Sequence, residues 1–103
     1  MAKFVALYGK PDDVEGFEDH YRNRHLPLVE QWPHLQSWST TRFTGTPRGG
    51  EPAYHLMFEA VFASEDDLAE AMRSDAMRQT GMDAAQMVKQ YGATATMLTG
   101  PDF

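Results

Sequence analysis

The sequence is 103 residues long, has a formal net charge of −6 and contains no cysteine. The length predicts one domain over residues 1–103, and the acidic balance without a basic stripe excludes nucleic acid as a partner. Because there is no cysteine, disulfides, thiolate metal sites and cysteine nucleophiles are excluded. The sequence shows neither a membrane-spanning apolar run nor a signal peptide, so we expect a cytoplasmic protein.

The first third of the chain predicts a strand followed by a helix. Residues 3–9 form a nearly continuous apolar run, which predicts a strand covered on both faces. Asp12 or Asp13 is positioned to cap a helix over residues 14–26. Pro27 disfavours the helical conformation of the residue before it, so the regular helix is expected to end or kink there.

The remaining elements are a hairpin, two helical regions and a last strand. Residues 35–44 and 53–63 predict two strands joined by a loop rich in glycine and proline. A serine-led capping box at residues 64–67 begins the next helix. A further helical region over residues 74–90 is expected to be interrupted near Gly81, and a final strand follows at 93–98.

The order β-α-β-β-α-β predicts an α+β fold, a ferredoxin-like sandwich with an antiparallel four-stranded sheet. The third strand carries bulky residues on both faces: Tyr54, Leu56, Phe58, Ala60 and Phe62 on one, His55, Met57, Glu59 and Val61 on the other. A sheet with helices on one face leaves the second face uncovered. A second copy of the chain would cover it, so we expect a homodimer.

His25 is the first candidate for chemistry. It follows Phe17 by eight residues and Tyr21 by four, so it shares their apolar helix stripe. One interpretation is a core histidine satisfied by the backbone or the helix dipole. The other is a general acid or base, because imidazole titrates near neutral pH.

Residues of the predicted hairpin are candidates for binding a ligand. His55 and Glu59 share one strand face, and Trp38, Thr40 and Arg42 share a face of the neighbouring strand. If these faces coincide, they form an apolar cavity with an aromatic wall and a cation. The alternative is an exposed strand face or a cross-strand ion pair.

Other chemistry finds little support in the sequence. His20 is expected to face solvent, and His34 lies in a connection. No spacing of histidines and acids predicts a metal site, and no nucleotide-binding or nucleophile-elbow motif is present. We therefore expect no metal and no cofactor, and any enzymatic activity would be acid–base chemistry.

The first third of the chain resembles the EthD family, named from ethyl tert-butyl ether degradation. The resemblance rests on Tyr8-Gly9-Lys10-Pro11 and on Phe17, Tyr21, His25, Pro27, Leu28 and Val29. It implies a dimeric α/β barrel with a cavity between each sheet and its helices, and His25 facing that cavity. EthD proteins have no settled biochemical role, so the resemblance specifies the fold better than the activity.

The leading hypothesis is a cofactor-free isomerase, cyclase or lyase of catabolism or secondary metabolism that acts on a small hydrophobic or aromatic compound. His25 would be the acid or base and Tyr21 or Tyr8 its hydrogen-bonding partner, with Trp38, Arg42, His55 and Glu59 as further pocket candidates. One alternative is a non-catalytic ligand-binding or accessory protein to an oxygenase. Another is a cofactor-free or haem-handling monooxygenase.

Overall fold

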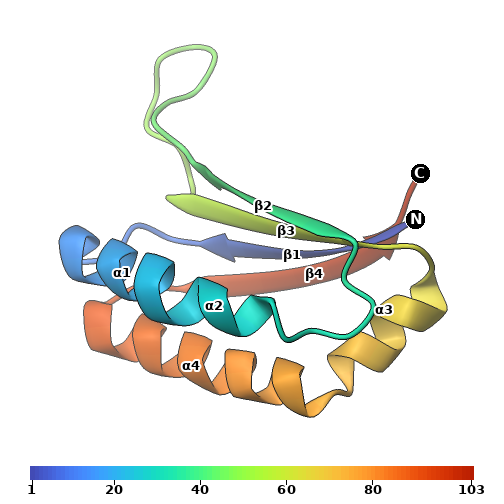
Figure 1. Cartoon of the computed structure of the whole chain (residues 1–103). Helices are drawn as coiled ribbons and strands as arrows, with labels where there is room; N and C mark the ends of the chain where they lie inside the picture. The colour runs from blue at the N-terminus through green and yellow to red at the C-terminus, as the bar shows by residue number, and fades with distance from the viewer.

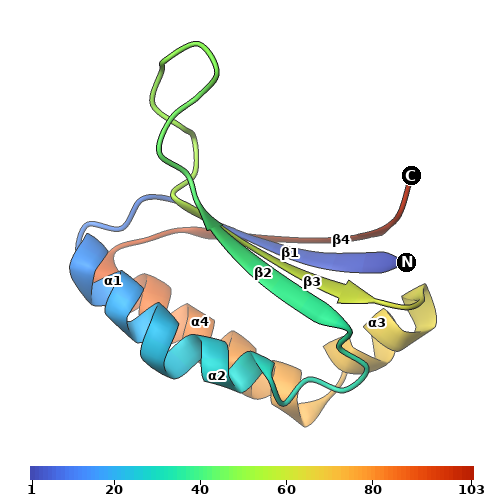
Figure 2. The ribbon, with the colours of Figure 1, turned by 45° about the horizontal axis from the view of Figure 1, so that its top comes forward.

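The computed structural model describes all 103 residues as a four-stranded sheet with helices against one face (Figures 1 and 2). The strands are β1 Ala2–Tyr8, β2 Ser37–Arg42, β3 Leu56–Phe62 and β4 Ala95–Pro101, and the helices are α1 Val14–His20, the π-helical turn η1 Tyr21–His25, α2 Leu26–Val29, α3 Glu65–Met72 and α4 Asp75–Tyr91. All strand pairs are antiparallel, in the order β2-β3-β1-β4. This confirms the predicted ferredoxin-like α+β fold. No helix is both long and apolar enough to cross a membrane.

The core lies between the sheet and the helices and is rich in aromatic rings. Alternate residues of β1 and β3 point into it, including Phe4, Tyr8, Phe58 and Phe62, all at most 9% exposed. The residues between them on both strands are more exposed. Within one chain β1 is therefore covered on one face only, and cover of its second face would have to come from another copy of the chain.

The first helical segment is longer and less regular than predicted. It continues past Pro27 to Val29, and its middle turn, η1, is π-helical, with the Leu26 N–H bonded to the Tyr21 carbonyl. Pro27 lies in the first turn of α2, where the absence of an N–H costs little. The cap at Asp13 is confirmed, since its carboxylate accepts from the Gly16 N–H at 2.9 Å.

The two helical regions after β3 divide at Ser74, as predicted, but the second is not interrupted. α3 ends at Met72 and α4 begins after Ser74, whose hydroxyl caps it. α4 then continues through Gly81 without interruption, so the predicted break there is wrong. An interior glycine costs a helix only about 1 kcal/mol, and α4 recovers this by burying Thr80, Ala84 and Met87.

The hairpin strands are shorter than predicted. The connection over residues 43–55 leaves the sheet and projects away from the helices (Figure 1). In the paired part, Trp38, Thr40 and Arg42 lie opposite Ala60, Phe58 and Leu56. Directly opposed residues share a face of a sheet, so the side chains of β2 at these positions face the helix layer.

Candidate active site

Two histidines of the first helical segment share one carboxylate of α4. Asp83 Oδ2 lies 2.8 Å from His25 Nδ1, and its two oxygens lie 3.0 and 3.1 Å from His20 Nε2. Both histidines are 5% exposed. A carboxylate only accepts, so each of these two ring nitrogens carries a proton and donates it to Asp83.

His25 is arranged as a neutral base. Its Nδ1 donates to Asp83, which leaves Nε2 unprotonated and without a partner in the protein. Burial lowers the pKa of His25 below its usual 6.5, and the attraction of Asp83 offsets this only in part. The ring is therefore uncharged at pH 7 and able to accept a proton at Nε2.

Asp83 stays charged in this environment. Its partial burial would raise the pKa of the carboxyl group, but the hydrogen bonds from His20 and His25 outweigh that effect and lower the pKa. His20 is held on its other side by the Tyr91 hydroxyl, 3.4 Å from Nδ1. The result is a carboxylate anion held at the Nδ1 edge of the His25 ring.

An apolar cavity of about 210 Å³ lies in front of His25, between the sheet, α2 and α4. The residues that line it are Phe4, Ala6, Tyr8, His25, Val29, Trp32, Phe58, Met77, Thr80, Gly81, Ala84 and Met97. An apolar protein cavity of ~150 Å³ is enough to admit benzene. This cavity therefore has room for one substituted ring.

Tyr8 supplies the second polar group of the cavity. Its side chain is 1% exposed, and its hydroxyl forms no hydrogen bond within the protein. Burial raises the pKa of Tyr8, helped by Tyr21 and Asp83, so the hydroxyl keeps its proton. Thr80, in contrast, is already satisfied, because its hydroxyl accepts from the Trp32 indole and donates to the Ala76 carbonyl. His25 and Tyr8 are thus the two groups here that can bond a ligand.

Tyr21 packs against a face of the His25 ring and does not line this cavity. Its ring stacks on the His25 ring with centroids 5.7 Å apart, and its hydroxyl lies 2.8 Å from the Thr40 hydroxyl. Burial raises the pKa of Tyr21 to about 12. Its position suits it to hold the His25 ring in place, whereas Tyr8 is the tyrosine that lines the cavity.

The four hairpin candidates do not converge on the His25 cavity. Arg42 and His55 both contact Glu18 on α1, with His55 Nε2 2.8 Å from its carboxylate. Trp38 is partly buried and stacks on Phe58 at the edge of the core. Glu59 points to the opposite face of the sheet, 3.7 Å from Lys3. The expectation that His55 and Glu59 share one cavity with Trp38 and Arg42 is therefore wrong.

Sequence reasoning missed His20 and Asp83. His20 was expected in solvent, but α4 covers that side of α1, and the ring packs against Tyr91. The sequence signal was the spacing Phe17, His20, Tyr21, which places His20 on the flank of the buried stripe. Asp83 is an acidic residue on the helix stripe of Thr80, Ala84 and Met87. The predicted break near Gly81 separated it from Thr80, so this pattern was not recognised. Nowhere do three or more His, Asp or Glu side chains have the geometry of a metal site.

A ferredoxin-like sheet with an apolar cavity beneath its helices defines a small α+β protein with a ligand-sized internal site. The family model described as the EthD domain matches residues 11–90 of this chain. The chain belongs to the EthD family.

Similar proteins agree with this assignment. An EthD family protein from Bacillus halodurans, known from a crystal structure, is 33% identical with a TM-score of 0.88, covering 100% of this chain and 99% of that one. An uncharacterised 11.0 kDa protein of Rhodococcus erythropolis, encoded in the thcB-thcC intergenic region, is 25% identical over 82% of each chain. SnoaB of Streptomyces nogalater, a cofactor-independent oxygenase, shares the fold at 13% identity, with a TM-score of 0.67 over 99% of this chain and 92% of that one.

The lowered pKa of His25 predicts a loss of stability in mild acid. Below about pH 6.5 the unfolded chain protonates this histidine, whereas the folded protein resists protonation. The His25 contribution is therefore present above pH 6.5 and is lost as the pH falls, by at most about 1.4 kcal/mol per pH unit. Urea unfolding at pH 7.5 and pH 5.0 measures this loss. His25→Gln should lose less stability over the same interval, and an equal loss would contradict the assignment.

Proposed function

We propose that this protein is a cofactor-free acid–base enzyme that moves a proton on a small, largely apolar, oxygenated or aromatic compound. The observation that carries the proposal is the His25 ring at the cavity wall, with Nδ1 fixed on Asp83 and Nε2 unprotonated. A base with these properties in an apolar cavity matches the requirements of general base catalysis.

The proposed first step is removal of a proton from a carbon next to a carbonyl, or from a phenolic oxygen. His25 Nε2 takes the proton, and the electron pair of the broken bond moves onto the carbonyl or phenolic oxygen. The imidazolium formed is stabilised by the Asp83 carboxylate, 2.8 Å from Nδ1. The Tyr8 hydroxyl donates to the oxyanion. Return of the proton from Nε2 to another carbon completes an isomerisation or accompanies ring closure.

The cavity indicates the size and polarity of the substrate. At about 210 Å³ it suits a single substituted ring or an equivalent branched chain. Nine of its twelve lining residues are hydrophobic, which favours a molecule with few polar groups. One oxygen within reach of Tyr8 and one acidic hydrogen toward His25 satisfy both polar groups of the wall.

The alternative functions require different properties of His25. A non-catalytic carrier or oxygenase accessory needs the cavity but not an unprotonated Nε2, so its ligand affinity would not depend on pH between 5 and 8. A cofactor-free oxygenase, the activity named for SnoaB, could use the same base to form the carbanion or phenolate that reacts with oxygen. Haem is less well suited, because a porphyrin needs more room than one ring. Oxygen consumption and a hemin absorbance titration separate these cases.

The outer face of the sheet supports a homodimer as part of the proposal. It carries Val5, Leu7, Met57, Val61 and Leu98, with Leu98 53% exposed. Exposed apolar clusters of this kind mark protein contacts. Two copies meeting through this face would cover it and leave both His25 cavities on the helix side.

Replacement of His25 by asparagine should abolish proton transfer without unfolding the protein. The assay follows deuterium uptake in D₂O by proton NMR, using single-ring ketones and phenols with an exchangeable carbon-bound hydrogen. The wild type should accelerate exchange in at least one of them, and His25→Asn should lose about 10²- to 10⁴-fold of that acceleration. Tyr8→Phe should show a smaller loss, because the base remains.

Controls for this experiment are melting temperature and ligand binding, both of which should persist in His25→Asn. Equal exchange in the wild type and His25→Asn would contradict catalysis by His25. Binding by the wild type without accelerated exchange in any compound would favour the carrier.

A charge on the outer sheet face should separate the proposed dimer. Leu98→Arg places a cation in the apolar face, and light scattering after size-exclusion chromatography should then give the monomer mass of 11.6 kDa instead of twice that value. Thr99→Arg is the matched control, since Thr99 lies on the same strand but points to the helix side. A monomeric wild type, or a dimeric Leu98→Arg, would rule out this interface.

A further inference from the structure

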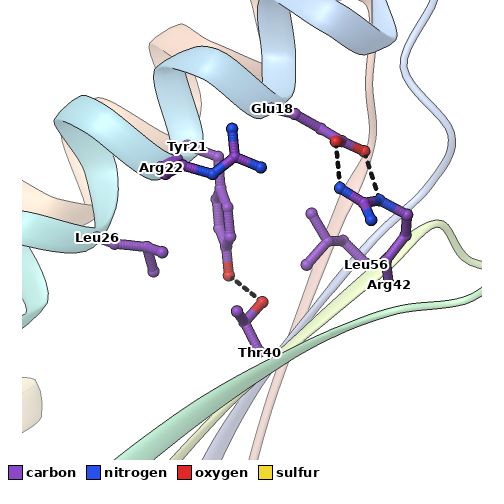
Figure 3. A pocket seen from close by; sticks show the side chains of 7 residues that line it. All are labelled: Glu18, Tyr21, Arg22, Leu26, Thr40, Arg42 and Leu56. Atoms are coloured by element: carbon purple, nitrogen blue, oxygen red, sulfur yellow. Dashed lines mark hydrogen bonds and ion pairs between the residues drawn. The ribbon is translucent and has the colours of Figure 1, made fainter.

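A second pocket lies on the other side of Tyr21, between the first helical segment and the edge strand β2 (Figure 3). It has a volume of about 190 Å³ and opens to solvent. Its lining residues are Glu18, Tyr21, Arg22, Leu26, Thr40, Arg42 and Leu56. None of them lines the His25 cavity, so this pocket is a separate site whose ligand the proposed function does not specify.

One of its two arginines is neutralised within the protein. Arg42 Nε and Nη2 lie 3.0 and 2.5 Å from the two oxygens of Glu18, a two-pronged ion pair that Figure 3 shows at one end of the pocket. The hydrogen bond from Arg42 is the main cause that lowers the pKa of Glu18 to about 2. Glu18 therefore remains a carboxylate, and the pair adds no net charge to the pocket.

Arg22 is the unpaired charge. It is exposed at the pocket wall, beside Tyr21, and forms no ion pair or hydrogen bond within the protein (Figure 3). The pocket thus carries a surplus positive charge in a chain whose net charge is −6. In an acidic protein this local excess attracts anions to this place and not to the surface as a whole.

The other polar groups of the pocket do not compete for that role. Thr40 donates its hydroxyl hydrogen to the Met57 carbonyl at 3.1 Å, so the Tyr21 hydroxyl is the donor in their mutual hydrogen bond. Neither hydroxyl has a hydrogen left for a ligand. The available donors are the Arg22 guanidinium and the nitrogen of Arg42 that does not face Glu18.

The rest of the wall is apolar. Leu26, Leu56 and the Tyr21 ring lie between the helix and the sheet (Figure 3). A guanidinium matches a carboxylate with two parallel hydrogen bonds, while these three side chains favour a hydrocarbon body. We infer that this pocket binds a small organic carboxylate with an apolar body, held through its carboxylate by Arg22.

Isothermal titration with benzoate tests the assignment, with benzamide and acetate as comparison ligands. Benzamide keeps the ring and lacks the charge, and acetate keeps the charge and lacks the ring. Benzoate should bind more tightly than both. Arg22→Gln should weaken benzoate binding about tenfold or more, as expected for loss of a charged hydrogen bond.

Arg24→Gln is the matched control, because Arg24 lies in the same π-helical turn, is exposed and does not line the pocket. It removes the same charge and should leave benzoate affinity unchanged. His25→Asn should also keep it, which separates this site from the proposed catalytic cavity. Equal effects of the Arg22 and Arg24 substitutions, equal binding of benzoate and acetate, or no benzoate binding would each overturn the assignment.

Discussion

The candidate site depends on one interaction, the double hydrogen bond of the Asp83 carboxylate to His20 and His25. It joins the first helical segment to α4 through residues 58 and 63 positions apart in the chain, which meet only in the folded protein. It places a charge where burial alone would disfavour one, and the two N–H donors compensate that cost. The same bonds select the His25 tautomer in which Nε2 carries no proton.

The π-helical turn η1 gives this interaction its geometry. One turn with i→i+5 bonding lies between α1 and α2 and contains both Tyr21 and His25. Single π turns inside α-helices are frequent at functional sites. Here the turn carries Tyr21 and His25 stacked on each other, so that Tyr21 separates the His25 cavity from the arginine-lined pocket.

The sequence predicted the fold well and placed His25 on the buried stripe of the first helical segment, where it lies, and the reasons are local. Strand alternation, the caps at Asp13 and Ser64 and the motif of Phe17, Tyr21 and His25 each depend on residues within one turn or strand. The partners of the site are not local. Asp83 reaches His25 only after α4 docks on α1, and Glu18 reaches Arg42 and His55 only after the hairpin folds over α1. Glu59 lies on the opposite face of the sheet from Trp38 and Arg42. This depends on strand register, since a shift of one residue moves a side chain to the other face.

The central claim is that His25, at the wall of the cavity, is a neutral base with Nε2 unprotonated. The ¹⁵N chemical shifts of the His25 ring at pH 7 measure this directly. The account predicts an Nδ1–H tautomer, with Nε2 at the shift of an unprotonated nitrogen. A ring protonated on both nitrogens, or one that carries its single proton on Nε2, would contradict it.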